Sequence, residues 1–143
     1  QLPVSEDMTA FLSSHQMGVT QLAIAYCDAL IDNTAARTAL FPLFNPAADA
    51  NAISDADWDT QFIYPMVDAA LNTGLGTQPN RDDVRAELQA LLNSTADIKP
   101  IGNPDGLPDG LSRCGGSCPA GRAAVAAKAA CAVVLGSASV TMQ

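Results

Sequence analysis

Four cysteines and one histidine are the residues of this sequence whose side chains are best suited to redox chemistry or metal binding. The cysteines are Cys27, Cys114, Cys118 and Cys131, and the histidine is His15. Thiolates and imidazoles bind zinc and haem iron, and paired thiols form disulfides or exchange electrons. The even number of cysteines favours disulfides, and disulfides favour an oxidising compartment.

Four cysteines allow three pairings, and sequence alone does not choose among them. Cys114 and Cys118 enclose Gly-Gly-Ser, a segment in which the backbone can turn tightly enough for a short bridge. Cys27 and Cys131 each lie inside a long helical pattern, and a bridge between them would tie the first helix to the last. We therefore favour these two pairs. A redox or zinc site is the alternative, although neither Cys-x-x-Cys nor paired zinc-ligand spacing is present.

His15 lies between Leu12 and Val19 on the apolar stripe of the first helical pattern. The ordinary role of a histidine there is a buried imidazole bonded to a carbonyl across a helical bundle. The functional alternative is ligation of haem or a metal, with Met8 or Met17 as second ligand, in an electron-transfer accessory domain. Met17, however, points to another face of the helix, and no Cys-x-x-Cys-His attachment motif is present.

Catalytic groups around the histidine are not apparent. Ser13 and Ser14 are its neighbours in sequence but lie off its helix face, and no Gly-x-Ser-x-Gly turn is present. We therefore expect a protein without enzymatic activity.

Two groups of carboxylates suggest calcium. Asp55, Asp57 and Asp59 match the first three ligand positions of a calcium loop, but Thr60 and Met66 stand where that loop needs glycine and glutamate. Carboxylates that complement the positive end of a helix explain the same three residues.

The second group lies in a segment rich in proline and glycine. Asn103, Asp105 and Asp109 could form a weak extracellular calcium site with help from backbone carbonyls. The helical pattern is absent around them, and we expect an irregular loop over about 95–117.

The elements that must position these residues are predicted to be helices. On the first helix, apolar residues and His15 recur at steps of three and four, at Met8, Leu12, Val19, Leu22, Tyr26 and Leu30, which predicts one buried face. The first two predicted helices are Phe11–Asp32 and Ala35–Phe41, the second capped by Asn33 or Thr34. A third helical segment is capped by Ser54 and is broken or kinked at Pro65, and a fourth begins at Pro79-Asn80 with Val84, Leu88, Leu91 and Leu92 on its apolar stripe. The last runs from Cys118 to about Ala138, with Pro119 at its first position.

Composition agrees with an all-α fold. Hydrophobic residues make up 48% of the 143 residues but aromatic residues only 5%, and alanine dominates, which favours close helix packing over sheet. We expect a single domain over 1–143, built as a disulfide-stapled bundle of about five or six helices. The net charge of −8 makes nucleic acid an unsuitable partner, and no apolar run is long enough for a membrane span.

The chain begins without Met, a basic segment or an apolar signal segment, which predicts a mature secreted protein or an excised piece of a larger one. The strings Phe11 to Asp32, Thr77 to Leu92 and Cys118 to Val140 resemble a helical, cysteine-bearing module of large secreted bacterial multidomain proteins, sometimes found beside laminin-G-like or other adhesive β-domains. The shared marks are His15-Gln16-Met17 and the four cysteines. The resemblance implies an extracellular or periplasmic, non-catalytic role and no cofactor, and no adhesive domain is present in this chain.

The last helix has more apolar surface than one neighbouring helix covers. Its small residues Ala123, Ala127, Ala130 and Val134 share one side, whereas Val125, Val133 and Met142 lie elsewhere. The helix is therefore either central in the bundle or in contact with another subunit, and we favour the second. The sequence thus predicts a structural or protein-interaction module of a cell-surface assembly, with other subunits or domains as partners.

Overall fold

The structure is a computed structural model that describes residues 13–71, 76, 78–93, 110–114 and 117–137. All regular elements in these ranges are helical: α1 (Ser13–Asp32), α2 (Thr34–Leu40), a 3-10 turn (Ala50–Ala52), α3 (Asp55–Trp58), α4 (Tyr64–Ala70), α5 (Arg81–Asn93) and α6 (Arg122–Leu135). A π-helical turn, Asp59–Ile63, joins α3 to α4 in one continuous rod. The predicted all-α bundle of about five or six helices, carrying two disulfides, is confirmed.

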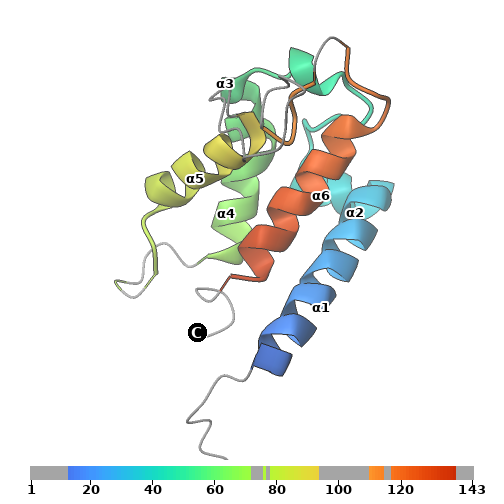
Figure 1. Cartoon of the computed structure of the whole chain (residues 1–143). Coiled ribbons are helices and arrows are strands. Elements are labelled where there is room, and N and C mark those ends of the chain that lie inside the picture. Colours follow the sequence, from blue (N-terminus) through green and yellow to red (C-terminus); the bar gives the residue numbers. More distant parts are fainter. Residues whose placement is uncertain (1–12, 72–75, 77, 94–109, 115–116, 138–143) are drawn as a thin grey trace, which may run out of the picture.

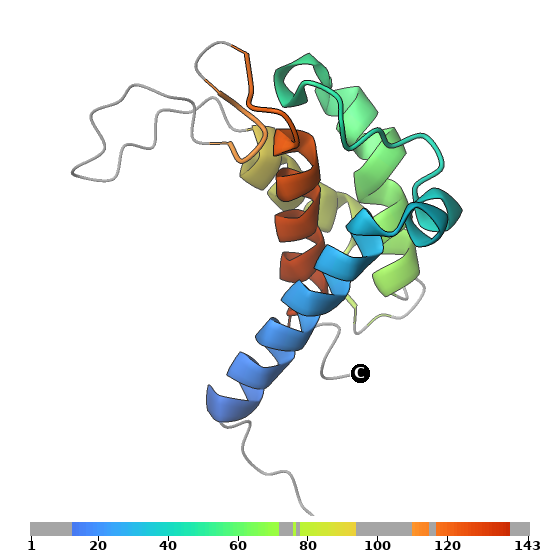
Figure 2. The ribbon, with the colours of Figure 1, turned by 90° about the vertical axis from the view of Figure 1, so that its right-hand side faces the viewer.

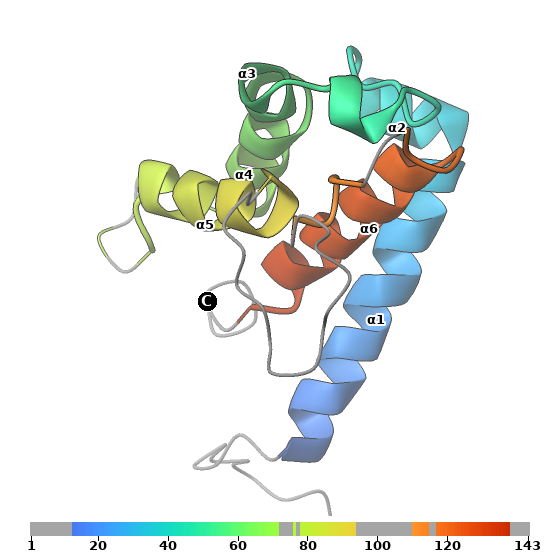
Figure 3. The same ribbon diagram turned by 45° about the horizontal axis from the view of Figure 1, so that its top comes forward.

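Helix α6 forms the middle layer of the bundle (Figure 1). Helix α1 runs antiparallel to it on one side, while α4 and α5 pack on the other side (Figure 3). The N-terminal turns of α1 extend beyond the other helices (Figure 2). A long part of the surface of α1 therefore has no neighbouring helix among the described residues.

Small residues on α6 allow this central position. Ala123, Ala126, Ala127 and Ala130 are all buried, and side chains of this size let the helix axes approach closely. The larger core side chains gather near α2 and α3, where the ring centroids of Phe41 and Phe62 are 4.7 Å apart and those of Trp58 and Phe62 are 6.0 Å apart in an edge-to-face arrangement.

The buried face of α1 differs from the predicted one. Leu22 and Tyr26 remain 71% and 56% exposed, whereas Ala23, Cys27 and Ile31 are buried. Leu30 is buried as predicted. The physical reason is that α6 lies against the helix face centred on Cys27, which is rotated away from the longest apolar stripe.

Two N-caps confirm sequence predictions. The side-chain oxygen of Asn33 accepts a hydrogen bond from the Ala36 amide and opens α2. Ser54 opens α3: its Oγ accepts from the Asp57 amide at 3.1 Å and donates to Asp57 Oδ2 at 2.6 Å.

The sequence predicts a kink or a break at Pro65, and the structure has a new helix type with Pro65 in its first turn but no gap in the helical rod. The rod continues through Pro65, which occupies the first turn of α4. A proline lacks the amide proton that an α-helix needs at that position, and the π-helical turn immediately before it shifts the bonding pattern, so that the Tyr64 amide donates to the carbonyl of Asp59. The change of helix type takes the place of a break.

The start of the last helix was also predicted wrongly. Cys118 and Pro119 have no regular structure, and α6 begins at Arg122 after Gly121, whose φ of +81° is in the left-handed region. That conformation interrupts the helix pattern and favours glycine. Helix α5 agrees better: Leu88 and Leu92 are buried.

Candidate functional site

The bridge between Cys27 and Cys131 lies at the contact of α1 with α6. Their Cα atoms are 5.8 Å apart and both residues are completely buried. The predicted pairing is therefore confirmed. The bridge holds the two helices in one fixed register, so any surface that they share is rigid.

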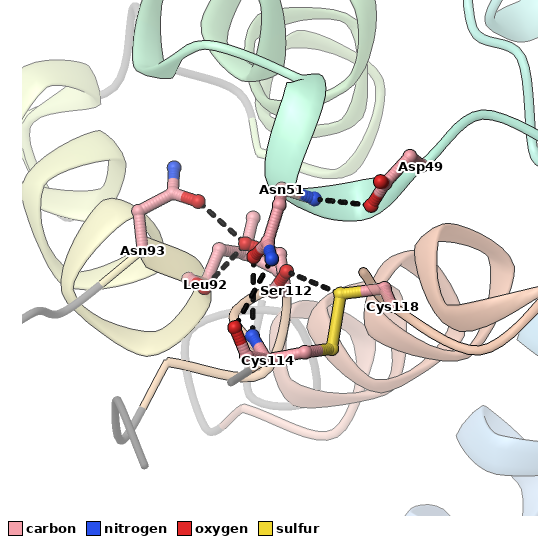
Figure 4. Close-up of a disulfide and its surroundings, with 7 residues drawn as sticks. All are labelled: Asp49, Asn51, Leu92, Asn93, Ser112, Cys114 and Cys118. Atoms are coloured by element: carbon pink, nitrogen blue, oxygen red, sulfur yellow. Dashed lines mark hydrogen bonds between the residues drawn. A yellow bond between two sulfur atoms is a disulfide. The ribbon is translucent and has the colours of Figure 1, made fainter. Parts of the chain in front are cut away.

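The second bridge, between Cys114 and Cys118, lies beside the C-terminal end of α5 (Figure 4). The Asn51 side chain holds its backbone from the opposite side: Asn51 Nδ2 donates to the Cys114 carbonyl at 3.0 Å, and the Cys114 amide donates to Asn51 Oδ1 at 3.1 Å. The Cys118 sulfur lies 3.6 Å from the Ser112 carbonyl oxygen. This predicted pair is confirmed too, and its surroundings are those of a structural bridge.

Ser112, which lies in the same region (Figure 4), caps α5 together with Leu111. The amides of Leu111 and Ser112 donate to the carbonyls of Leu91 and Leu92, both at 2.9 Å. These carbonyls belong to the last turn of the helix, where no helical amide is left to pair with them. The completely buried Ser112 hydroxyl lies 2.6 Å from the Leu92 carbonyl oxygen and from Asn93 Oδ1. The segment thus serves to end α5.

Among the described residues, Asp59 is the one buried carboxylate, with only 5% of its surface exposed. Arg85 donates to its Oδ2 from both Nε and Nη2, at 2.9 and 2.6 Å, and Gln89 donates to its Oδ1 at 2.7 Å. The hydrogen bonds from Arg85 to Asp59 raise the pKa of the Arg85 guanidinium. Asp59 therefore joins the π-helical turn to α5, a role that sequence reasoning missed because its partner residues are far away in the chain.

His15 lies on the exposed part of α1, so the expected buried position is wrong. It belongs to the N-terminal turns, which extend beyond the helices that would have to cover it (Figure 2). Met17, the alternative second ligand of a haem or metal, is exposed as well. The described residues contain no group of three or more histidine, cysteine or acidic side chains arranged to hold a metal.

The calcium candidates Asn103, Asp105 and Asp109 lie outside the described residues. In the other acidic group, Asp57 takes part in the N-cap of α3 and Asp59 pairs with Arg85. Asp55 Oδ1 lies 3.0 Å from Arg113 Nη2. These three carboxylates therefore have helix-capping and ion-pair roles.

The surface shared by α1 and α6 carries the main unexplained feature, a set of exposed apolar side chains. Seven large apolar side chains are exposed among the described residues, and six of them lie on these two helices. The six are Met17, Leu22, Ile24 and Tyr26 on α1, and Val125 and Val133 on α6. The seventh, Leu43, follows α2. Such a concentration is typical of an interaction surface.

An open groove of about 500 Å³ runs between the two helices on one side of α1. We call this surface the groove face and define it by the residues that line it: Thr20, Ile24 and Asp28 from α1, and Lys128, Ala129, Ala132, Val133 and Gly136 from α6 or its end. A second depression, on the other side of α1, is lined by Val19, Leu22, Ala23, Tyr26 and Leu135. Helix α1 is thus a ridge between two apolar hollows.

Charged groups gather at one end of the groove face. Lys128 Nζ lies 2.7 Å from both Asp28 Oδ1 and Asp32 Oδ1. The hydrogen bonds to these two carboxylates raise the pKa of Lys128. At the other end, the Gln16 side chain donates to the Gly136 carbonyl at 3.1 Å. One end of the groove face therefore carries an ion-pair cluster, and the other is joined by an uncharged hydrogen bond.

The position of this face could have been read in part from the sequence. Between Ser13 and Cys27, and again from Ala129 to the end of the sequence, there is no Asp, Glu, Lys or Arg. In a chain with a net charge of −8, two uncharged helical stretches joined by a disulfide indicate a shared neutral surface.

Comparison with family models, with curated proteins and with solved structures found no match to the chain.

Proposed function

We propose that the chain is a non-catalytic protein-interaction module of an extracellular or cell-surface assembly, and that α1 and α6 present its contact surface. The observation that carries this proposal is that six of the seven large exposed apolar side chains of the described residues lie on these two helices. Exposed apolar groups are costly in water unless a partner covers them.

The two disulfides support the extracellular part of the proposal. The described residues include no free cysteine, and disulfides persist in secreted and periplasmic proteins but rarely in the cytosol. No helix among the described residues is both long and apolar enough to cross a membrane. The resemblance of three segments to a module of secreted bacterial proteins points in the same direction.

Rigidity also supports a contact surface. The Cys27–Cys131 bridge fixes α1 against α6, so the exposed side chains are held in place before a partner arrives. A surface that is ordered in advance loses less entropy on binding than a flexible one.

An apolar dye tests the proposal. The oxidised chain should either enhance the fluorescence of such a dye or associate in light scattering, because the face is open in the isolated domain. The double variant Ile24→Asp and Val133→Asp should lose both properties, whereas Leu43→Asp, at an exposed apolar site on neither α1 nor α6, should keep them. A strict monomer that binds no dye would contradict the proposal.

A further inference from the structure

The groove face can pack against the same face of a second copy. It is made by two antiparallel helices held together by a disulfide (Figure 1). In a two-fold symmetric contact the same surface meets itself, and two such helix pairs form a four-helix arrangement. Resting on the proposed function, we infer that the occupant of the groove face is a second copy of this chain, packed through its own groove face.

The distribution of charge favours this occupant. Away from the face, exposed carboxylates occur at several places, among them Asp49, Asp82 and Glu87. Two acidic copies that met through those surfaces would oppose like charges, which is unfavourable. The neutral part of the groove face, around Ile24 and Val133, lets them meet without this penalty. A basic partner would instead be attracted to the carboxylates elsewhere.

The ion-pair cluster at one end sets the direction of the contact. Lys128 balances only one of the two carboxylates that it contacts, Asp28 and Asp32, so each cluster keeps a net negative charge. A parallel arrangement would place two such clusters together. The antiparallel two-fold arrangement places each cluster over the uncharged end of the other copy, near Thr20 and Gly136.

Sedimentation equilibrium of the oxidised chain, over a wide concentration range and at low and high salt, tests the inference. We expect a dimer whose dissociation constant falls several-fold as salt rises, because salt screens the repulsion between two copies that each carry −8. Binding to a basic partner would instead weaken as salt rises, because salt screens the attraction between opposite charges.

Single variants locate the contact. Ile24→Asp on α1 and Val133→Asp on α6 should each raise the dissociation constant by about 100-fold or more, because each places two desolvated carboxylates in the dimer. Both positions are exposed in one copy, so either variant should fold, with unchanged circular dichroism and no free thiol. Leu43→Asp, at an exposed apolar site on neither helix, is the matched control and should leave the dimer intact. Leu22→Asp tests instead whether the contact uses the other side of α1.

Three outcomes would overturn the inference. The first is a monomer at every concentration. The second is a dimer that Ile24→Asp and Val133→Asp leave unchanged, and the third is a dimer that Leu22→Asp dissociates, which would place the contact on the other side of α1. A monomer that still binds an apolar dye through Ile24 and Val133 would reject the second copy but keep the interaction surface. A monomer without dye binding would reject both.

Discussion

At the scale of single residues, the buried carboxylate of Asp59 has the most consequential contacts. It accepts two hydrogen bonds from Arg85 and one from Gln89. Replacing Asp59 by Asn keeps the shape of the side chain but removes its negative charge and replaces one acceptor oxygen by an NH2 donor. We expect Asp59→Asn to lower the free energy of unfolding by about 2–3 kcal/mol, because it removes the buried charge that pairs with Arg85 and places an NH2 group against one of the donors. Urea denaturation at neutral pH measures this.

Asp68 provides the matched control for that measurement. It also accepts two hydrogen bonds from an arginine, Arg81, but both side chains are more than one-third exposed. Water therefore screens the pair, and Asp68→Asn should produce a much smaller loss than Asp59→Asn. Equal losses would mean that burial does not determine the importance of the Asp59 contacts.

The N-cap of α3 gives a prediction about pH. The side-chain hydrogen bond from Ser54 is the main cause that lowers the pKa of Asp57 in the folded chain. The resulting stabilisation is complete above the ordinary carboxyl pKa of about 4 and is lost as the pH falls through the lower folded value. The stability difference between wild type and Ser54→Ala should thus be larger at pH 7 than at pH 2.

Part of that difference should remain in acid, because the Ser54 oxygen also accepts from the Asp57 amide and this bond does not depend on ionisation. Thr60→Ala is the control, since the Thr60 hydroxyl donates to the Ala56 carbonyl and does not touch the Asp57 carboxylate. Chemical denaturation of the three proteins at both pH values provides the comparison. If the stability difference between wild type and Ser54→Ala is the same at pH 7 and pH 2, the ionised Asp57 carboxylate does not contribute to the cap.

At the scale of elements, Asn51 holds the segment that contains the second disulfide. Its carboxamide pairs with both backbone groups of Cys114. Asn51→Ala should therefore increase the rate at which a dithiol reduces the Cys114–Cys118 bridge, while the buried Cys27–Cys131 bridge should react at an unchanged rate. Timed alkylation followed by mass spectrometry reports both rates in one sample. The exposed Asn45, whose side chain accepts from the nearby Ala47 amide, is the control position.

Several elements could be predicted from sequence because their causes are local. Asn33 and Ser54 each cap a helix through a residue three positions away, and the stripe of Leu88 and Leu92 matches the period of α5. Both cysteine pairs were predicted as well, since short spacing and long helices are visible in the sequence. These features need little knowledge of the tertiary fold.

Other elements depend on distant neighbours and could not be predicted in this way. The buried face of α1 is chosen by α6, which meets it at Cys27, and not by the longest apolar stripe through Leu22 and Tyr26. Pro65 is tolerated because the preceding turn becomes π-helical. The groove face needs both helices, so a pattern on either helix alone identifies only half of it.

At the scale of the whole molecule, the two disulfides should differ in their effect on stability. The Cys27–Cys131 bridge joins residues 104 positions apart, and the Cys114–Cys118 bridge residues only four apart. In the chain-entropy model the long loop contributes about 4–5 kcal/mol and the short one about 2 kcal/mol. Replacing Cys27 and Cys131 together by Ala should thus lower the free energy of unfolding more than the same change at Cys114 and Cys118. Similar losses in urea denaturation would contradict this difference.

The Cys27–Cys131 bridge also determines how the molecule carries tension. A force applied to the two ends of the chain passes along α1 as far as Cys27, crosses the sulfur atoms and leaves through the end of α6, because this covalent route is the shortest. The enclosed segment of 104 positions bears no force, and about 350 Å of extended chain stays hidden while the bridge is intact. In single-molecule pulling, this length should appear only after a reductant has opened the bridge. With the bridge intact, the domain should therefore be an almost inextensible link.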